Sequence, residues 1–285
     1  MDEIEFYLID LKSRFPIDRS KYYLSYSGGK DSHFLYWFIK EYLHDTEIEV
    51  VAVNTYMEHP NISARMYKYA DRVLLPAMKP LEIKEKYGSP CFSKIQDDFI
   101  MRYQRGCRTE SLMQRITGKT FIGSDGKEHK STFNLNKTAR ELTLSGKLHK
   151  VSPICCKKIK KDTLKKYEKQ SGKKPILGVR GGEGKLRETQ YKACFTKDGK
   201  FTPLYDLSDE LLNAIYDRYQ IEIPNVYQYT DRTGCMGCPY GSWKRETEKE
   251  LELLPPAQQR FVIELFRESY DVLGIDYKHI QQKLF

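Results

Sequence analysis

A glycine-rich loop is the first stretch of this 285-residue sequence that could carry out chemistry. The loop, residues 27–32, reads Ser-Gly-Gly-Lys-Asp-Ser and follows the aromatic and aliphatic residues 22–26, which predict a buried strand. Apolar residues at helical spacing come next, so the loop joins a strand to the start of a helix. Its glycines allow close backbone approach to an anion, and the first N–H groups of a helix have no intrahelical partner. With the hydroxyls of Ser27 and Ser32 and the cation of Lys30, these features predict a phosphate-binding site.

Individual residues of this region have distinct expected roles. Lys30 would stabilise charge that develops on a phosphate, and Asp31 would orient Lys30 or bind Mg²⁺. Two arginines that follow a later strand are candidate clamps, because a guanidinium can meet a phosphate through two hydrogen bonds. The alternative is that these are surface arginines and that the loop is an ordinary surface turn. The predicted nucleotide-binding residues are Ser27, Gly28, Gly29, Lys30, Ser32, Arg180 and Arg187.

Four of the seven cysteines form a second constellation, Cys155-Cys156 and Cys235-x-x-Cys238. A CxxC turn brings two thiolates to one metal centre, and two such pairs make a four-thiolate site for zinc or an iron–sulfur cluster. Adjacent cysteines are awkward around one tetrahedral zinc, and a larger cubane tolerates them better. The alternative is four buried thiols without a metal.

The order of strands and helices predicts an α/β fold with a doubly wound, mainly parallel sheet. Residues 77–150 interrupt the alternation, and we expect them to form a partly helical insertion or lid on the C-terminal face of the sheet. We expect a nucleotide-binding domain over 1–240, with the cysteine region at 151–240, and a helical extension over 241–285. The predicted strands are 22–26, 48–53, 73–75 and 175–179, and the predicted helices are 3–14, 63–70, 156–170, 209–219, 243–254 and 256–272.

Composition narrows the class of protein. Hydrophobic residues make up 40% of the chain and aromatic residues 13%, which favours a folded protein. No apolar stretch reaches the ~18 residues of a membrane span, and the acidic N-terminal helix is unlike a secretory signal, so we expect a cytoplasmic protein with no membrane partner. The net charge of +9 suits polyanions such as nucleotides or nucleic acid, although a solvated basic surface is an equal alternative.

The loop at residues 27–32 resembles the PP-loop of the ATP pyrophosphatases and adenine-nucleotide alpha hydrolases. Together with the cysteine motifs at 153–160 and 234–239, it looks like the iron–sulfur branch of the phosphoadenosine/adenosine phosphosulfate (PAPS) reductase family. The turn at 178–180 and the segment at 203–206 also match that family's pattern. The resemblance covers roughly residues 20–240. It implies ATP or an adenylyl sulfate as ligand and a 4Fe–4S cluster on Cys155, Cys156, Cys235 and Cys238.

One departure from that family affects the expected reaction. Its reductases resemble each other in a C-terminal Glu-Cys-Gly-Leu-His tail that carries the nucleophilic cysteine, whereas this chain has no cysteine after Cys238. The scaffold is also similar to the ATP-pyrophosphatase component of bacterial DNA phosphorothioation systems, which lack that tail. This second resemblance implies cleavage of ATP between the α- and β-phosphates, activation of an acceptor oxygen by AMP, and its displacement by sulfur.

We therefore expect an ATP pyrophosphatase that activates an acceptor, with nucleic acid as the acceptor class, for sulfur transfer. The expected partners are an adenine nucleotide, that acceptor and a sulfur donor such as a cysteine desulfurase, and the oligomeric state stays open. The first alternative is a thiol-dependent PAPS or adenosine phosphosulfate reductase in which Cys194 or Cys107 replaces the missing nucleophile. Cys194 lies in a basic segment, which would lower the pKa of its thiol. The second alternative is a non-catalytic nucleotide-binding module.

Overall fold

The computed structural model of the chain describes residues 2–131, 133–181, 191–230, 233–240, 242 and 246–282. The chain forms two compact units, each built from two separate segments. Unit 1 contains Met1–Pro76 and Asp162–Gly234, and unit 2 contains Ala77–Lys161 and Cys235–Phe285. Unit 2 thus groups the predicted insertion with all four cysteines of the two motifs. The domain boundary expected at residue 240 stays a prediction.

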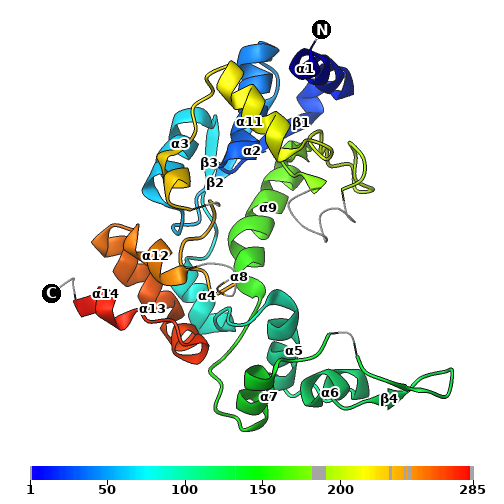
Figure 1. Cartoon of the computed structure of the whole chain (residues 1–285), viewed down its shortest axis with the longest axis vertical. Helices are drawn as coiled ribbons and strands as arrows, with labels where there is room; N and C mark the ends of the chain where they lie inside the picture. Colours follow the sequence, from blue (N-terminus) through cyan, green and yellow to red (C-terminus); the bar gives the residue numbers. More distant parts are fainter. Residues whose placement is uncertain are drawn as a thin grey trace. The chain divides into compact units, whose positions relative to one another are not determined.

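Unit 1 is built on a four-stranded parallel sheet with the order β3-β2-β1-β6 (Figure 1). The chain runs outward from β1 through β2 to β3, and β6 then pairs with the other side of β1. This reversal makes the edge between β1 and β6 the topological switch point, where open α/β sheets bind ligands. The predicted α/β, doubly wound fold is confirmed. The strands are β1 (Tyr22–Tyr26), β2 (Glu49–Val53), β3 (Arg72–Leu74) and β6 (Lys174–Ile176).

Helices cover both faces of this sheet because strand side chains alternate between the faces. Leu24, Val50 and Ile176 belong to the main core cluster, to which four helices contribute buried side chains. Tyr23 and Val51 pack with Tyr167 of a fifth helix in a second cluster. The four helices are α1 (Glu3–Arg14), α2 (Lys30–Trp37), α3 (Pro60–Tyr69) and α11 (Asp209–Arg218), and the fifth is α9 (Asp162–Ser171).

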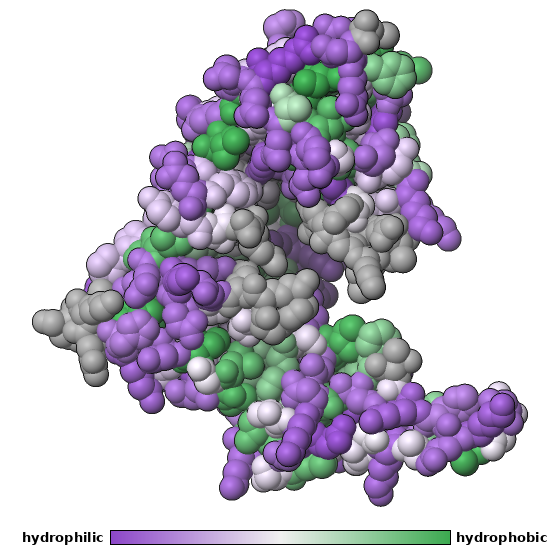
Figure 2. Space-filling model, viewed as in Figure 1, coloured by the Kyte–Doolittle hydropathy of each residue, from purple (hydrophilic) through white to green (hydrophobic). Residues whose placement is uncertain are grey.

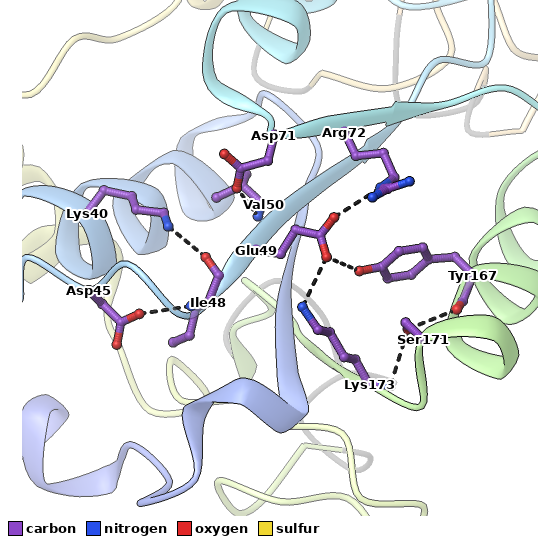
Figure 3. A network of polar contacts seen from close by, with 10 residues as sticks. All are labelled: Lys40, Asp45, Ile48, Glu49, Val50, Asp71, Arg72, Tyr167, Ser171 and Lys173. Atoms are coloured by element: carbon purple, nitrogen blue, oxygen red, sulfur yellow. Dashed lines mark hydrogen bonds and ion pairs between the residues drawn. The ribbon is translucent and has the colours of Figure 1, made fainter.

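A polar network joins α9 and the residues that follow it to the start of β2 (Figure 3). The Glu49 carboxylate accepts hydrogen bonds from Tyr167 Oη at 2.5 Å, Lys173 Nζ at 3.0 Å and Arg72 Nε at 3.0 Å. Its side chain is 20% exposed. The network therefore holds a helix from late in the chain against two early strands.

Several predicted elements of unit 1 end at other residues in the structure. The predicted strand 175–179 is observed over Lys174–Ile176, and on the side away from β1 Ile176 forms one parallel bridge with Phe201. The helix expected over 156–170 is divided, with α9 preceded by π-helical turns over Lys157–Lys161. A π-helix, Phe38–Tyr42, also extends α2, and 3₁₀ turns occur at Arg19–Lys21 and Asn225–Gln228 (η5).

Unit 2 is mainly helical, and its described part contains one small antiparallel hairpin. Cys91, Ile100 and Leu112 lie in a core cluster between three of its helices. The glycines at 123 and 126 form the hairpin tip, and hydrophilic residues dominate the hairpin surface (Figure 2). The helix expected over 243–254 is described over Thr247–Glu252, and residues 243–245 lie outside the described part of the chain. The elements are α4 (Pro80–Tyr87), α5 (Lys94–Gln104), α6 (Glu110–Thr117), β4 (Phe121–Ile122), β5 (Glu128–His129), α7 (Lys137–Leu144), α8 (Ile154–Cys156), α12 (Thr247–Glu252), α13 (Pro256–Leu273) and α14 (Lys278–Gln282).

Among the described residues, no helix combines the length and the apolar composition that crossing a membrane requires.

Candidate functional site

The glycine-rich loop lies at the C-terminal end of β1, beside the switch point between β1 and β6. Gly28 has a φ of +75°, and a Cβ there would lie 3.0 Å from Ile62 Cγ2 and 3.1 Å from the Ile62 carbonyl oxygen. Only glycine adopts this backbone conformation and this close approach without strain. Gly29 is the N-cap residue of α2, so the first backbone N–H groups of α2 follow directly. The loop therefore has the local structure that the sequence predicts.

The two serines of the loop bond to each other. Ser27 Oγ lies 3.0 Å from Ser32 Oγ, and the Ser27 N–H donates to Ser32 Oγ at 3.2 Å. Ser32 Oγ in turn donates to the Gly29 carbonyl at 3.0 Å, and the residue is 4% exposed. Ser32 thus closes the loop on itself, and direct contact of either hydroxyl with a phosphate stays a prediction.

Residues of α11 hold Lys30 at both its side chain and its backbone. Lys30 Nζ donates to Asn213 Oδ1 and lies 5.1 Å from the centroid of the Tyr216 ring. Tyr216 Oη donates to the Lys30 carbonyl at 2.6 Å. Burial lowers the pKa of Lys30, and the negative charge of Asp31 partly opposes that effect. The ammonium group therefore lies in a partly desolvated position, where its interaction with an anion would be stronger than in water.

Arg180 is brought to the start of α2 by the segment after β6. Its Nε lies 2.6 Å from Asp31 Oδ1, and its Nη1 lies 2.7 Å from Asp209 Oδ1. Arg180 is only 8% exposed. Burial by itself would lower the pKa of Arg180, but the two carboxylates outweigh burial and raise it. Asp31 thus pairs with Arg180, a contact that the sequence does not predict, and its expected role of orienting Lys30 or binding Mg²⁺ stays a prediction.

Gly178 allows the segment after β6 to lie close enough to α2 for Arg180 to reach Asp31. A Cβ at Gly178 would lie 2.9 Å from the Asp31 carbonyl carbon and 2.9 Å from the Ser32 nitrogen. The backbone after β6 consequently packs directly on the first turn of α2. The other predicted clamp, Arg187, lies outside the described residues.

A cavity of about 440 Å³ borders Lys30. This volume is within the range of small-molecule sites in proteins. Its remaining walls come from the segment after α11, which carries no recognisable sequence motif. Sequence reasoning also missed three residues of α11, because they carry no motif and reach the loop only through the packing of that helix. These residues are Asp209, Asn213 and Tyr216. The residues that line the cavity are Lys30, Ile223, Pro224, Asn225, Tyr227 and Gln228.

The four motif cysteines lie together in unit 2. Cys155 and Cys156 form the end of α8, while Cys235 and Cys238 border a turn in which the Cys238 N–H bonds to the Cys235 carbonyl at 3.4 Å. Among the described residues, none of the four forms a disulfide bond. Burial raises the pKa of Cys155, and the charges of Cys235, Cys156 and Cys238 raise it further. The four sulfurs are thus close enough to interact electrostatically, although the two pairs are far apart in sequence.

The CxxC turn is fixed from two sides. Gly237 has a φ of +66°, its N–H donates to Glu250 Oε2 at 3.0 Å, and its carbonyl accepts from Tyr270 Oη. Just after the turn, Tyr240 Oη donates to the buried Asp97 carboxylate at 2.7 Å. Helices α12, α13 and α5 therefore position the turn that carries Cys235 and Cys238.

The fit to a metal centre rests on the chemistry of the donors. Four thiols are the ligand set of structural zinc sites and of iron–sulfur clusters. In the part of the chain that the structure describes, no three histidine, cysteine, aspartate or glutamate side chains are arranged to hold an ion. The structure thus gathers the predicted ligands without placing them at ligating distances.

Cys194 and Cys107, the remaining candidate nucleophiles, have thiol pKa values that shift in opposite directions. The prediction that its basic segment lowers the pKa of Cys194 is wrong, because burial raises it and the nearby Arg14 only partly offsets that rise. Sequence proximity to lysines did not reveal that the thiol is partly buried. In contrast, backbone hydrogen bonding at Thr109 lowers the pKa of Cys107, which lies in an accessible segment after α5.

Comparison with known proteins finds similarity at the level of structure. No family model matches the sequence, and no curated protein matches it. Among solved structures, the chain is similar to a phosphoadenylyl-sulfate (PAPS) reductase from Candida auris, determined as a phosphate complex. The TM-score is 0.40 at 12% sequence identity, and the alignment covers 80% of this chain and 86% of that chain.

Proposed function

We propose that this protein is a PP-loop enzyme that cleaves ATP to AMP and pyrophosphate and so activates an acceptor for sulfur transfer. The observation that carries the proposal is the convergence of Lys30 and Arg180 on the glycine-rich loop at the switch point. Two cations from different elements beside a helix N-terminus are suited to a polyphosphate, whose charge neither could neutralise alone.

The proposed reaction has two steps. An acceptor oxygen attacks the α-phosphorus of ATP, and the bond to the β-phosphate oxygen breaks, releasing pyrophosphate. A sulfur nucleophile then displaces that oxygen, which leaves as part of AMP. Lys30 would stabilise charge on the phosphates, and Arg180, oriented by Asp31 and Asp209, would fix their position. Mg²⁺ would enter with the nucleotide phosphates.

We further propose that Cys155, Cys156, Cys235 and Cys238 hold a 4Fe–4S cluster. Support comes from the presence of all four cysteines in unit 2 and from the turn that Glu250 and Tyr270 fix. When bound, the cluster would supply a redox centre or a structural cross-link between α8 and the CxxC turn. The nucleic-acid acceptor, a donor such as a cysteine desulfurase and a cytoplasmic location complete the proposal and rest on sequence reasoning.

Product analysis tests the reaction. Anaerobically purified protein would be incubated with ATP and Mg²⁺, with and without DNA or RNA, and the nucleotides separated by chromatography. We expect AMP and pyrophosphate in equal amounts, and a loss of at least about 100-fold in Lys30→Met. Lys21→Met is the matched control, because the Lys21 side chain is 73% exposed. Formation of ADP and phosphate, or no turnover under any condition, would refute the proposal.

The lowered pKa of Cys107 favours one second candidate, the thiol-dependent reductase. In that reaction a thiolate attacks the sulfate sulfur of an adenylyl sulfate, the nucleotide phosphate leaves, and thioredoxin dithiol reduces the resulting thiosulfonate to release sulfite. Sulfite production that disappears in Cys107→Ser would support this candidate. Sulfite production unchanged in Cys107→Ser would exclude Cys107 as the nucleophile.

A further inference from the structure

Tyr227 occupies the ligand side of the glycine-rich loop. It belongs to the short 3₁₀ helix η5, and its hydroxyl accepts a hydrogen bond from the Lys30 N–H at 2.9 Å. Thr233 Oγ1 lies 3.2 Å from the same hydroxyl. A Cβ on Gly29 would lie 2.5 Å from Thr233 Oγ1 and 3.1 Å from Tyr227 Oη. The space that the glycine leaves open for a ligand is thus filled by two hydroxyl groups of the chain itself.

The side chain of Lys30, like its backbone N–H, has partners within the chain. Its ammonium group bonds to Asn213 and lies over the Tyr216 ring. The backbone donor at the start of α2 and the cation of the loop therefore both have partners within unit 1. A phosphate that used them would have to replace these partners.

We propose that Tyr227 closes the glycine-rich loop in the ligand-free protein and that a nucleotide phosphate displaces its hydroxyl from the Lys30 amide. This inference rests on the proposed nucleotide site. The hydroxyl satisfies an amide that would otherwise lack an intrahelical partner, so closure stabilises the empty loop. A nucleotide must then displace the hydroxyl in order to bind. The apparent association constant is therefore the intrinsic constant multiplied by the fraction of molecules in which the loop is open.

The surroundings of Tyr227 allow this displacement. The tyrosine lines the cavity of about 440 Å³ that also borders Lys30, so open space adjoins its ring. Displacement requires a change at one short 3₁₀ element, whereas the sheet and α2 stay in place. The opposite role, in which Tyr227 donates its hydroxyl hydrogen to the bound phosphate, uses the same residue but predicts the opposite effect of removing the hydroxyl.

Calorimetric titration of the full chain with ATP and Mg²⁺ separates these roles. Tyr227→Phe keeps the ring and removes the hydroxyl, and we expect ATP to bind roughly threefold to tenfold more tightly, the effect of losing one competing hydrogen bond. Tyr229→Phe is the matched control, because Tyr229 is 69% exposed and follows the same 3₁₀ turn. Thr233→Val, which removes the group beside the Tyr227 hydroxyl, should shift the affinity in the same direction.

Hydrogen exchange followed by mass spectrometry gives a readout that needs no ligand. The peptide that contains Lys30 should exchange faster in Tyr227→Phe than in the wild type or in Tyr229→Phe. Equal exchange, or ATP binding that is unchanged or weaker in Tyr227→Phe, would overturn the inference. Binding by Tyr227→Phe alone would support it, and no binding by any variant would refute both closure and the nucleotide site. Tighter binding without AMP formation would leave closure standing and refute the proposed reaction.

Discussion

Three glycines beside the proposed nucleotide site are constrained by three different neighbours. Gly28 has a positive φ, Gly29 faces the Thr233 hydroxyl, and Gly178 lies against the backbone of Asp31 and Ser32. The first constraint is local, whereas the other two come from segments far along the chain. Substitutions at these positions therefore report on different parts of the site.

Gly178→Ala tests the contact between the segment after β6 and α2. We expect a loss of about 1–3 kcal/mol in the free energy of unfolding, because the nearest atoms to the new Cβ are backbone atoms that cannot rotate away. The nucleotide affinity should fall as well, since Arg180 would move with the displaced segment. Gly234→Ala is the control, because no atom lies within 4 Å of a Cβ there. Equal urea midpoints for the two variants would show that the contact is unimportant.

Arg180→Lys tests the paired carboxylates. Lysine keeps the positive charge but cannot contact Asp31 and Asp209 through two separate nitrogens as the guanidinium does. We expect a loss of about 1.5–3 kcal/mol in stability, the range for a hydrogen bond to a charged group, together with a higher KM for ATP. The exposed Arg218→Lys should leave both quantities almost unchanged. A normal KM in Arg180→Lys would contradict the proposed clamp.

At the scale of elements, two hydrogen bonds between side chains attach α9 to the sheet. Glu168 accepts from Tyr23 Oη at 3.0 Å, and Glu49 accepts from Tyr167 Oη at 2.5 Å, as Figure 3 shows. Burial of Glu49 would raise its pKa, but hydrogen bonds from Tyr167, Lys173 and Arg72 outweigh burial and lower the pKa from 4.5 to about 2. A carboxyl group with a lowered pKa in the folded state stabilises the fold above its unfolded pKa. That contribution is lost as the pH falls from about 4.5 to about 2.

Glu49→Gln should therefore destabilise the protein in a pH-dependent way. We expect the difference in unfolding free energy from the wild type to be largest at pH 6, at most about 3 kcal/mol, and to shrink as the pH falls towards 3. Urea unfolding at several pH values measures this difference. Glu47→Gln is a suitable control because Glu47 is exposed in the turn before β2. A difference that stays constant with pH would argue against the network.

At the scale of the whole molecule, unit 2 is built from two segments that lie on either side of the second segment of unit 1 in sequence. Cys155 and Cys156 belong to the first segment, and Cys235 and Cys238 belong to the second. A centre held by both pairs would cross-link the two segments of unit 2. Its loss should consequently lower the stability of that unit as well as remove the metal.

Iron and acid-labile sulfide content tests this arrangement. We expect about four irons per chain after anaerobic purification, and less than one in Cys235→Ser or Cys155→Ser. Cys194→Ser, whose thiol lies in unit 1, should keep the full content. One zinc per chain without sulfide would replace the proposed cluster by a structural zinc site.

Local sequence patterns determined the glycine-rich loop, most of the helices, the parallel sheet and the two cysteine pairs. These features depend on residues close together in the chain, such as the glycines of a strand-to-helix turn or the period of apolar side chains. The predicted strand 175–179 ends earlier in the structure, at Ile176, because no local pattern marks the last residue that pairs with β1.

Only the tertiary structure decided which groups surround the loop. Arg180 reaches Asp31, Tyr227 reaches the Lys30 amide, and burial reverses the expected pKa shift of Cys194. Each of these outcomes depends on side chains that are distant in sequence and on the solvent that packing excludes. The sequence by itself determined that the chain has a loop of the phosphate-binding type and a set of four cysteines. Packing decided that Arg180 pairs with Asp31, that the Tyr227 hydroxyl covers the Lys30 amide, and how far each thiol is buried.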